Sequence, residues 1–116
     1  MISSEHRFHG YGSLRYVYNR GKTVRSQFLS LRYVENRRRS EYRAAVVVSR
    51  KVHKSAVIRN RIRRRVYEAL RQYEPRIKSP YDLVFTVYSE QVADMDTEAL
   101  QRLVGAQLQK AGIVSL

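Results

Sequence analysis

Residues 54–71 read KSAVIRNRIRRRVYEALR, and this stretch decides the fold. Apolar residues recur in it at helical spacing and, at about 100° per residue, fall within one arc that would face a core. Ser55 can cap the first turn and Pro75 would end the helix, so the pattern predicts a helix from Ser55 to about Tyr73. The core-facing stripe of this helix consists of Ile58, Ile62, Val66, Ala69, Leu70 and Tyr73.

The opposite side of this predicted helix is densely basic. Five of the seven positions from 59 to 65 are arginine, and between Arg43 and Arg71 only Glu68 is acidic. Arginines spaced i, i+4 repel one another, and a bound polyanion would relieve that repulsion. A solvated surface is the simpler interpretation of an isolated charge run, but a merely soluble helix mixes charges of both signs. The density of arginine therefore favours a polyanionic ligand.

Charge is unevenly distributed along the 116 residues, whose formal net charge is +13. Residues 1–76 carry 20 basic and 5 acidic side chains, a net +15, whereas residues 77–116 carry 3 basic and 5 acidic, a net −2. Eighteen of the 23 basic residues are arginine, whose planar fork of donors suits phosphate oxygens. We therefore expect a polyanion to contact the first two thirds of the chain.

Composition excludes several classes of protein. A hydrophobic content of 43% argues against intrinsic disorder, and the length fits one domain over residues 1–116. The lack of cysteine excludes disulfides, thiolate nucleophiles and cysteine-bound zinc. The longest apolar run, Ala44–Val48, is too short to span a membrane, and residues 1–7 lack the apolar core of a signal peptide. We therefore expect a cytoplasmic protein with no membrane partner.

The first part of the chain combines a helical pattern with a strand pattern. Apolar residues at helical spacing predict a short helix from about 12 to 20. Residues 27–35 then alternate, with Leu29, Leu31 and Tyr33 on one face, which predicts a strand.

Two more strands and a last helix are expected further along. The polar residues 36–41 predict an exposed hairpin loop, and the two-sided apolar run within 43–49 predicts a central strand covered on both faces. Residues 81–88 alternate and predict another strand. An amphipathic stripe opened by Asp96 or Thr97 predicts the final helix. The order is helix, two or three strands, helix, strand, helix.

The stretch 54–71, with its core Arg59-Asn60-Arg61, closely resembles the signature helix of the bacterial ribonuclease P protein subunit. A strand ending in VSRK at residues 48–51 precedes it at the separation that this family shows, and the resemblance extends from Arg7 to about residue 112. It implies a small α+β domain of the order helix-strand-strand-strand-helix-strand-helix, with a mixed sheet packed against helices. It also implies a left-handed strand-helix-strand crossover, although about 98% of such connections are right-handed.

The resemblance implies an accessory role rather than a catalytic one. In that family an RNA subunit uses magnesium to remove the 5′ leader of precursor tRNA, and the protein supplies no catalytic residue and no metal ligand. One protein would bind one RNA subunit, and the helix that resembles the signature would face that RNA. The implied RNA-subunit contacts are Lys51, Lys54, Arg59, Asn60, Arg61, Arg63, Arg64 and Arg65.

The family also binds the single-stranded leader in a cleft between its first helix and the sheet, where aromatic side chains stack on bases. The residues that the resemblance places in this cleft are Phe8, Tyr11, Arg15, Tyr16, Tyr18, Arg32 and Tyr33. This sequence departs from the family at Leu14, where an aromatic residue is frequent, and at His53, where many relatives have a small residue. Core packing is the simpler role for Leu14, Val17, Phe28 and Phe85.

Other functions remain as alternatives. A ribosomal protein or RNA chaperone would share this charge and size, and copurification with ribosomal subunits rather than one catalytic RNA would identify it. A self-sufficient nuclease would need clustered carboxylates or paired histidines. The acidic residues of 94–98 are better explained as helix caps, and His6 with His9 lack a third ligand. A DNA-binding regulator ranks third because no helix-turn-helix pattern is visible.

Overall fold

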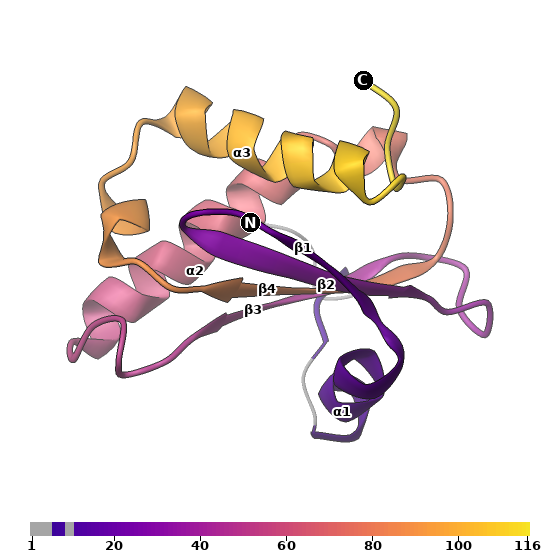
Figure 1. The fold of residues 1–116 in the computed structure, drawn as a ribbon, viewed down its shortest axis with the longest axis horizontal. Helices are drawn as coiled ribbons and strands as arrows, with labels where there is room; N and C mark the ends of the chain where they lie inside the picture. Colours follow the sequence, from indigo (N-terminus) through magenta and orange to yellow (C-terminus); the bar gives the residue numbers. More distant parts are fainter. Residues whose placement is uncertain (1–5, 9–10) are drawn as a thin grey trace.

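The computed structural model describes residues 6–8 and 11–116 (Figure 1). Within them, three α-helices, two short 3₁₀ helices and four strands follow one another along the chain. Their order is α1 (Tyr11–Arg20), β1 (Lys22–Arg25), β2 (Leu29–Glu35), β3 (Arg43–Val48), α2 (Ala56–Arg71), η2 (Glu74–Arg76), β4 (Tyr81–Val87), η3 (Glu90–Ala93) and α3 (Thr97–Lys110).

The four strands form one mixed sheet in the order β1-β2-β4-β3. β2 pairs antiparallel with β1 and β4, whereas β3 pairs parallel with β4. Helices α2 and α3 lie on one face of this sheet, and α1 lies on the other (Figure 1). This is the α+β architecture that the sequence predicts, with α2 connecting the parallel strands β3 and β4. The left-handed crossover stays a prediction.

The main core fills the space between the sheet and the helices α2 and α3. The stripe on α2 is confirmed, because Ile62, Val66 and Leu70 are fully buried. The predicted cap is also confirmed: the Ile58 N–H donates to Ser55 Oγ at 3.4 Å. The sheet contributes alternate residues of its strands, as the period of two requires. These are Leu29 and Leu31 from β2, Ala44, Val46 and Val48 from β3, and Leu83, Phe85 and Val87 from β4.

A second, smaller core lies between α1 and the other face of the sheet. It consists of four buried residues, with Leu14 half-buried beside them. The four are Phe8, Val17, Ala45 and Val84. The predicted packing roles of Leu14 and Val17 are therefore confirmed.

The prediction that the strand within 43–49 is central is wrong, because β3 lies at the edge of the sheet, where β4 is its neighbouring strand and a single bridge joins Ala44 to Arg7. Its two-sided apolar character reflects helices on both faces of the sheet rather than two strand neighbours. Its outer edge is partly occupied, since the Phe8 N–H donates to Ala44 O at 3.1 Å and the Val46 N–H donates to the Tyr67 hydroxyl at 3.2 Å.

The exposed loop predicted at 36–41 is confirmed, but it does not join a hairpin, because β2 pairs with β4 and not with β3. The loop crosses the start of β4 instead, and the Asn36 N–H donates to Pro80 O at 2.7 Å. β1 is the third strand before α2 that the resemblance implies, and the residue pattern alone left it open because its four residues are half-buried or exposed.

The last helix follows its predicted bounds. Asp96 caps α3 by accepting the Ala99 N–H at 3.2 Å, and Gly112 follows the helix at φ +79°, a left-handed conformation that glycine adopts without steric cost. In the part of the chain that the structure describes, no helix is both long and apolar enough to cross a membrane.

Candidate nucleic-acid interface

The residues predicted to contact the RNA subunit come from two adjacent elements. Lys51 and Lys54 are exposed in the loop between β3 and α2, and the others lie on the first ten residues of α2. Asn60, Arg61 and Arg64 are exposed, whereas the remaining arginines are half-buried. We call the predicted set, Lys51, Lys54, Arg59, Asn60, Arg61, Arg63, Arg64 and Arg65, the α2 basic surface.

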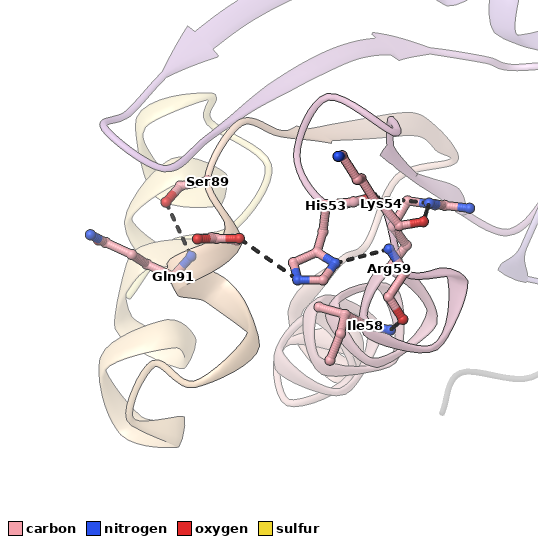
Figure 2. Close-up of polar contacts among 8 residues, drawn as sticks. His53, Lys54, Ile58, Arg59, Ser89 and Gln91 are labelled. Atoms are coloured by element: carbon pink, nitrogen blue, oxygen red, sulfur yellow. Dashed lines mark hydrogen bonds and ion pairs between the residues drawn. The ribbon is translucent and has the colours of Figure 1, made fainter.

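The loop that carries the two lysines is tied to the first turn of α2, as Figure 2 shows. Arg59 Nη1 donates to His53 O at 2.9 Å and to Lys54 O at 2.8 Å. The Ser55 N–H donates to His53 Nδ1 at 3.0 Å, which leaves the ring proton on Nε2, 3.8 Å from a Glu90 carboxylate oxygen. Arg59 therefore orders the loop from within and presents only part of its guanidinium to a ligand.

Arg61 and Arg65 are engaged with the segment that links β4 to α3. Arg61 Nε donates to Ala93 O at 2.9 Å, and its Nη2 lies 3.6 Å from the Asp94 carboxylate. Arg65 donates to the carbonyls of Val92, at 2.7 Å, and of Met95. These two arginines thus satisfy backbone carbonyls around η3, and they hold that segment against α2.

Arg63 and Arg64 face outward from the same helix. Arg63 donates to the Asn60 side-chain carbonyl one turn earlier. Arg64 is exposed and makes no hydrogen bond or ion pair with residues 6–8 or 11–116. It lines a groove of about 650 Å³ between α2 and α3, whose other walls include Gln72, Thr97 and Gln101. The cations most available to a polyanion are therefore Arg64 and the two loop lysines.

Of the acidic residues near α3, Asp96 is the cap that the sequence predicts, whereas the other two lie beside arginines. Asp96 caps the helix, Asp94 lies beside Arg61, and Glu98 is 3.9 Å from Arg102. Among residues 6–8 and 11–116, no group of three His, Cys, Asp or Glu side chains could hold a metal ion. His9 lies outside the described residues.

On the opposite face of the sheet, Arg32 fastens α1 in place. Its Nε donates to Val17 O at 3.1 Å, its Nη2 donates to Tyr18 O, and its Nη1 donates to Thr23 Oγ1 at 2.7 Å. The guanidinium therefore caps carbonyls in the last turn of α1, where a positive charge is favoured by the helix dipole. Arg32 positions the helix rather than offering all its donors to a ligand.

The aromatic residues predicted for the leader cleft lie in different surroundings. Tyr16 and Tyr18 are 46% and 42% exposed on α1, and Arg15 is exposed between them. Phe8 is buried, with the Arg43 guanidinium 4.7 Å from its ring centroid. The side chain of Tyr11 lies outside the described residues.

Tyr33 does not join the other leader residues. It packs at the margin of the main core, edge-on to Tyr81 with ring centroids 6.4 Å apart. Adjacent residues of a strand point to opposite faces, so Arg32 and Tyr33 cannot line one cleft. The resemblance places both residues in one leader cleft, and the alternation of β2 contradicts this, since Arg32 faces α1 and Tyr33 faces α2 and α3.

The sequence reasoning missed a buried polar cluster at the start of β3 and β4. Arg43 Nε and Nη2 each donate to the carboxylate of Asp82 at 3.0 Å, and the Asn36 side-chain N–H₂ donates to it at 3.0 Å as well. Asp82 is only 1% exposed. The available signal was a charged residue near the start of each of two apolar strands, which become cross-strand partners when β3 pairs with β4.

Comparisons with known proteins agree on one family. The family described as Ribonuclease P matches residues 2–112. The ribonuclease P protein component of Roseiflexus castenholzii is 42% identical over 94 residues, covering 81% of this chain and 75% of that protein. That of Chloroflexus aurantiacus is 43% identical over 97 residues, covering 84% and 70%.

Solved structures show the same fold. The Staphylococcus aureus RNase P protein superposes with a TM-score of 0.83 at 22% identity, covering 95% of this chain and 98% of that one. The Thermotoga maritima RNase P protein gives a TM-score of 0.76 at 20% identity, covering 89% and 96%.

Proposed function

This chain belongs to the bacterial ribonuclease P protein family, whose members are subunits of a ribonucleoprotein endoribonuclease, and we propose that it binds a catalytic RNA subunit through the α2 basic surface. We further propose that α1 and the adjoining sheet face bind the 5′ leader of precursor tRNA. In this proposal the RNA carries the chemistry with magnesium, and one protein binds one RNA subunit in the cytoplasm.

The observation that carries the proposal is the distribution of charge around α2. No acidic residue occurs between Glu41 and Glu68, and this interval contains the whole α2 basic surface. Its most available cations, Lys51, Lys54 and Arg64, stand on a loop and a helix that are locked together through Arg59. A loop backbone that is already ordered loses little conformational freedom when its lysines contact phosphates, and counterion release from the RNA adds to the affinity.

Exposed aromatic rings on α1 support the leader part of the proposal. Tyr18 presents a half-exposed ring beside the small core of α1, and Arg15 adds a cation on the same helix. Stacking of a base on an aromatic ring contributes about 1–3 kcal/mol and tolerates any base sequence. A leader of variable sequence is a ligand suited to such a surface.

Reconstitution tests the proposal directly. The purified protein is added to a bacterial ribonuclease P RNA at low magnesium, and 5′ leader release from a precursor tRNA is followed beside protein-only and RNA-only controls. We expect cleavage only when both components are present. Cleavage by the protein alone would place the chemistry in the protein, and failure of folded protein to stimulate the RNA would favour a ribosomal or chaperone role.

The leader assignment has its own test in the same assay. Tyr18→Ala should weaken binding of precursor tRNA by about tenfold and leave binding of mature tRNA unchanged, because only the precursor carries a leader. Equal losses for the two tRNAs would remove Tyr18 from the leader site.

A further inference from the structure

A short segment before α1 is tied to the outer edge of β3. Residues 6–8 run parallel to this strand, and the Phe8 N–H donates to Ala44 O at 3.1 Å. His6 Nδ1 lies 3.0 Å from the Tyr42 carbonyl oxygen, two residues earlier on the same edge. We call residues 6–8 the strap. It is held through backbone carbonyls of residues 42 and 44.

One end of the strap supports α1. Phe8 is buried and belongs to the small core together with Val17 of that helix. Tyr11, where α1 begins, follows Phe8 by three residues, a span of at most about 11 Å. The strap and the helix therefore share a core and a short connection, so a shift of the strap would move α1.

The other end of the strap is fastened to η2, just beyond α2. His6 Nε2 lies 3.2 Å from Glu74 Oε1, and the His6 ring stacks on Tyr42 with centroids 4.3 Å apart and planes 10° from parallel. The Tyr42 hydroxyl donates to the same Glu74 oxygen at 2.9 Å. His6 is buried, so these contacts are shielded from water. We call the three side chains the His6 clasp.

The geometry of the clasp favours a His6 ring with protons on both nitrogens. The Tyr42 carbonyl and the Glu74 carboxylate only accept hydrogen bonds. A neutral ring carries one proton, so the nitrogen that lacks it would direct its lone pair at an oxygen about 3 Å away. The imidazolium satisfies both contacts, and its charge lies against the Tyr42 ring and beside the carboxylate.

The elements packed around the clasp present cations that have other partners, and one further carboxylate. Arg76 of η2 donates to a backbone carbonyl, and Arg43 of β3 is paired with a buried carboxylate of β4. Arg7, the next residue of the strap, acts electrostatically on the Tyr67 phenol of α2. Glu41 adds negative charge beside the clasp. The surrounding charges therefore leave the ion pair of the clasp in place.

We propose that His6 is a positioning residue for α1, whose protonation closes the clasp and whose deprotonation loosens the strap. Histidine is the side chain that changes charge between about pH 5 and 8, so the strap responds to pH in that interval. Because the folded state favours the protonated ring, the clasp stabilises the fold at low pH and loses this contribution as pH rises. The proposal rests on the proposed function, since a loosened α1 is expected to bind the leader less tightly.

Thermal unfolding of the free full-length protein tests the clasp itself. His6→Gln removes the titrating ring, and Glu74→Gln removes the carboxylate that pairs with it. The wild-type midpoint should fall by about 4 °C between pH 6 and pH 8, and both variants should lose most of this fall. Glu98→Gln, at an exposed glutamate of α3, is the matched charge control and should keep it. His9 and His53 are retained in every variant, so their titration cancels in the comparison.

Precursor binding by the holoenzyme, reconstituted with a bacterial ribonuclease P RNA, tests the link to α1. Precursors with a long leader or a single-nucleotide leader are compared at pH 6 and pH 8, beside the affinity of the protein for the RNA subunit. The wild-type preference for the long leader should fall about threefold as pH rises. His6→Gln and Glu74→Gln should show a weaker preference that does not change with pH. The RNA-subunit affinity should change with pH equally in all proteins, because the α2 basic surface lies over the main core.

Each outcome decides one part of the proposal. A thermal midpoint that falls with pH in His6→Gln as it does in the wild type would overturn the clasp. Glu74→Gln keeps the ring, so it answers the same question if His6→Gln does not fold. If the midpoints behave as expected but the wild-type leader preference is equal at the two pH values, His6 does not position α1 and the proposal fails. If the wild-type holoenzyme distinguishes the two leaders at neither pH, the proposed leader site itself has failed, and the thermal midpoints still decide whether the clasp exists.

Discussion

Helices α1 and α2 lie on opposite faces of one sheet, and they differ in how firmly they are attached to it. α2 contributes five buried residues to the main core, which it shares with α3 and the sheet. Among the α1 side chains that the structure describes, those of residues 14–20, Val17 is the one that is fully buried, and the Arg32 guanidinium holds the last turn of the helix. The α2 side is thus held mainly by apolar packing, and the α1 side largely by polar contacts.

This difference suits the two ligands proposed for the two faces. A fixed set of phosphates in a folded catalytic RNA is best met by cations on a rigid platform, which α2 supplies. A single strand of variable sequence is best met by exposed aromatic rings on an element that can shift slightly, which α1 supplies. Substitutions that weaken one face at a time test whether the two helices differ in this way.

The largest effect should come from the packed side of α2. Leu70→Ala, at a residue with no exposed surface, should lower the free energy of unfolding by about 3 kcal/mol, because it removes a buried side chain and leaves a cavity. Val17→Ala on α1 should cost about 1.5 kcal/mol, since fewer methyl groups are lost. Urea unfolding of both variants measures the difference. Equal losses would show that α1 is held as firmly as α2.

A second pair of substitutions separates structural arginines from RNA-binding ones on α2. Arg65→Gln should lower the free energy of unfolding by about 1–2 kcal/mol, because it leaves the carbonyls of Val92 and Met95 without their donors. Arg64→Gln should leave stability unchanged and reduce the slope of log affinity against log salt by about 0.7–0.9. Thermal melting and filter binding at several salt concentrations distinguish the two. The division fails if Arg64→Gln destabilises the fold and Arg65→Gln does not.

A smaller effect is expected from the polar attachment of α1. Arg32→Gln removes the donors to Val17 O and Tyr18 O, and should cost about 1 kcal/mol of stability. Because α1 is then less well positioned, precursor binding should weaken severalfold while affinity for the RNA subunit is retained. Arg25→Gln, an exposed arginine on the neighbouring strand β1, controls for the loss of charge. Weaker RNA-subunit binding in Arg32→Gln alone would contradict the separation of the two faces.

Local patterns predicted the helices well because their causes are local. The apolar stripe of α2, its cap at Ser55 and the glycine after α3 each depend on neighbours within a few residues. The order of the strands depends on which distant segments pair. A strand such as Ala44–Val48 that is covered on both faces has the same apolar pattern at the edge of a sheet as at its centre. The central position predicted for β3 failed for that reason.

The candidate sites were predictable only as far as residue type. Density of arginine located the α2 basic surface, but Arg61 and Arg65 bind backbone carbonyls near η3, and backbone acceptors leave no signal in a sequence. Alternation correctly separated Arg32 from Tyr33, yet it could not say which helix covers which face. The pairing of Arg43 with Asp82 required the register of β3 on β4, which no local pattern contains.

The smallest effect is a loss of stability at alkaline pH, and it belongs to the α2 side. Burial, with a hydrogen bond to Glu74, raises the pKa of Tyr42, and burial raises the pKa of Tyr67 above its usual value of 10.0. Above pH 10 the unfolded chain releases these phenolic protons and the folded chain retains them, so stability falls as pH rises and is unaffected by these groups at lower pH. At pH 10.5 the Tyr42 phenol should cost about 0.8 kcal/mol. Tyr42→Phe should therefore flatten the dependence of unfolding free energy on pH above 10, measured by urea unfolding at fixed salt. The control is Val17→Ala: the four buried residues described in the small core beneath α1 do not titrate, so this variant should keep the parent's pH dependence. An unaltered alkaline slope in Tyr42→Phe would show that this phenol ionises equally in both states.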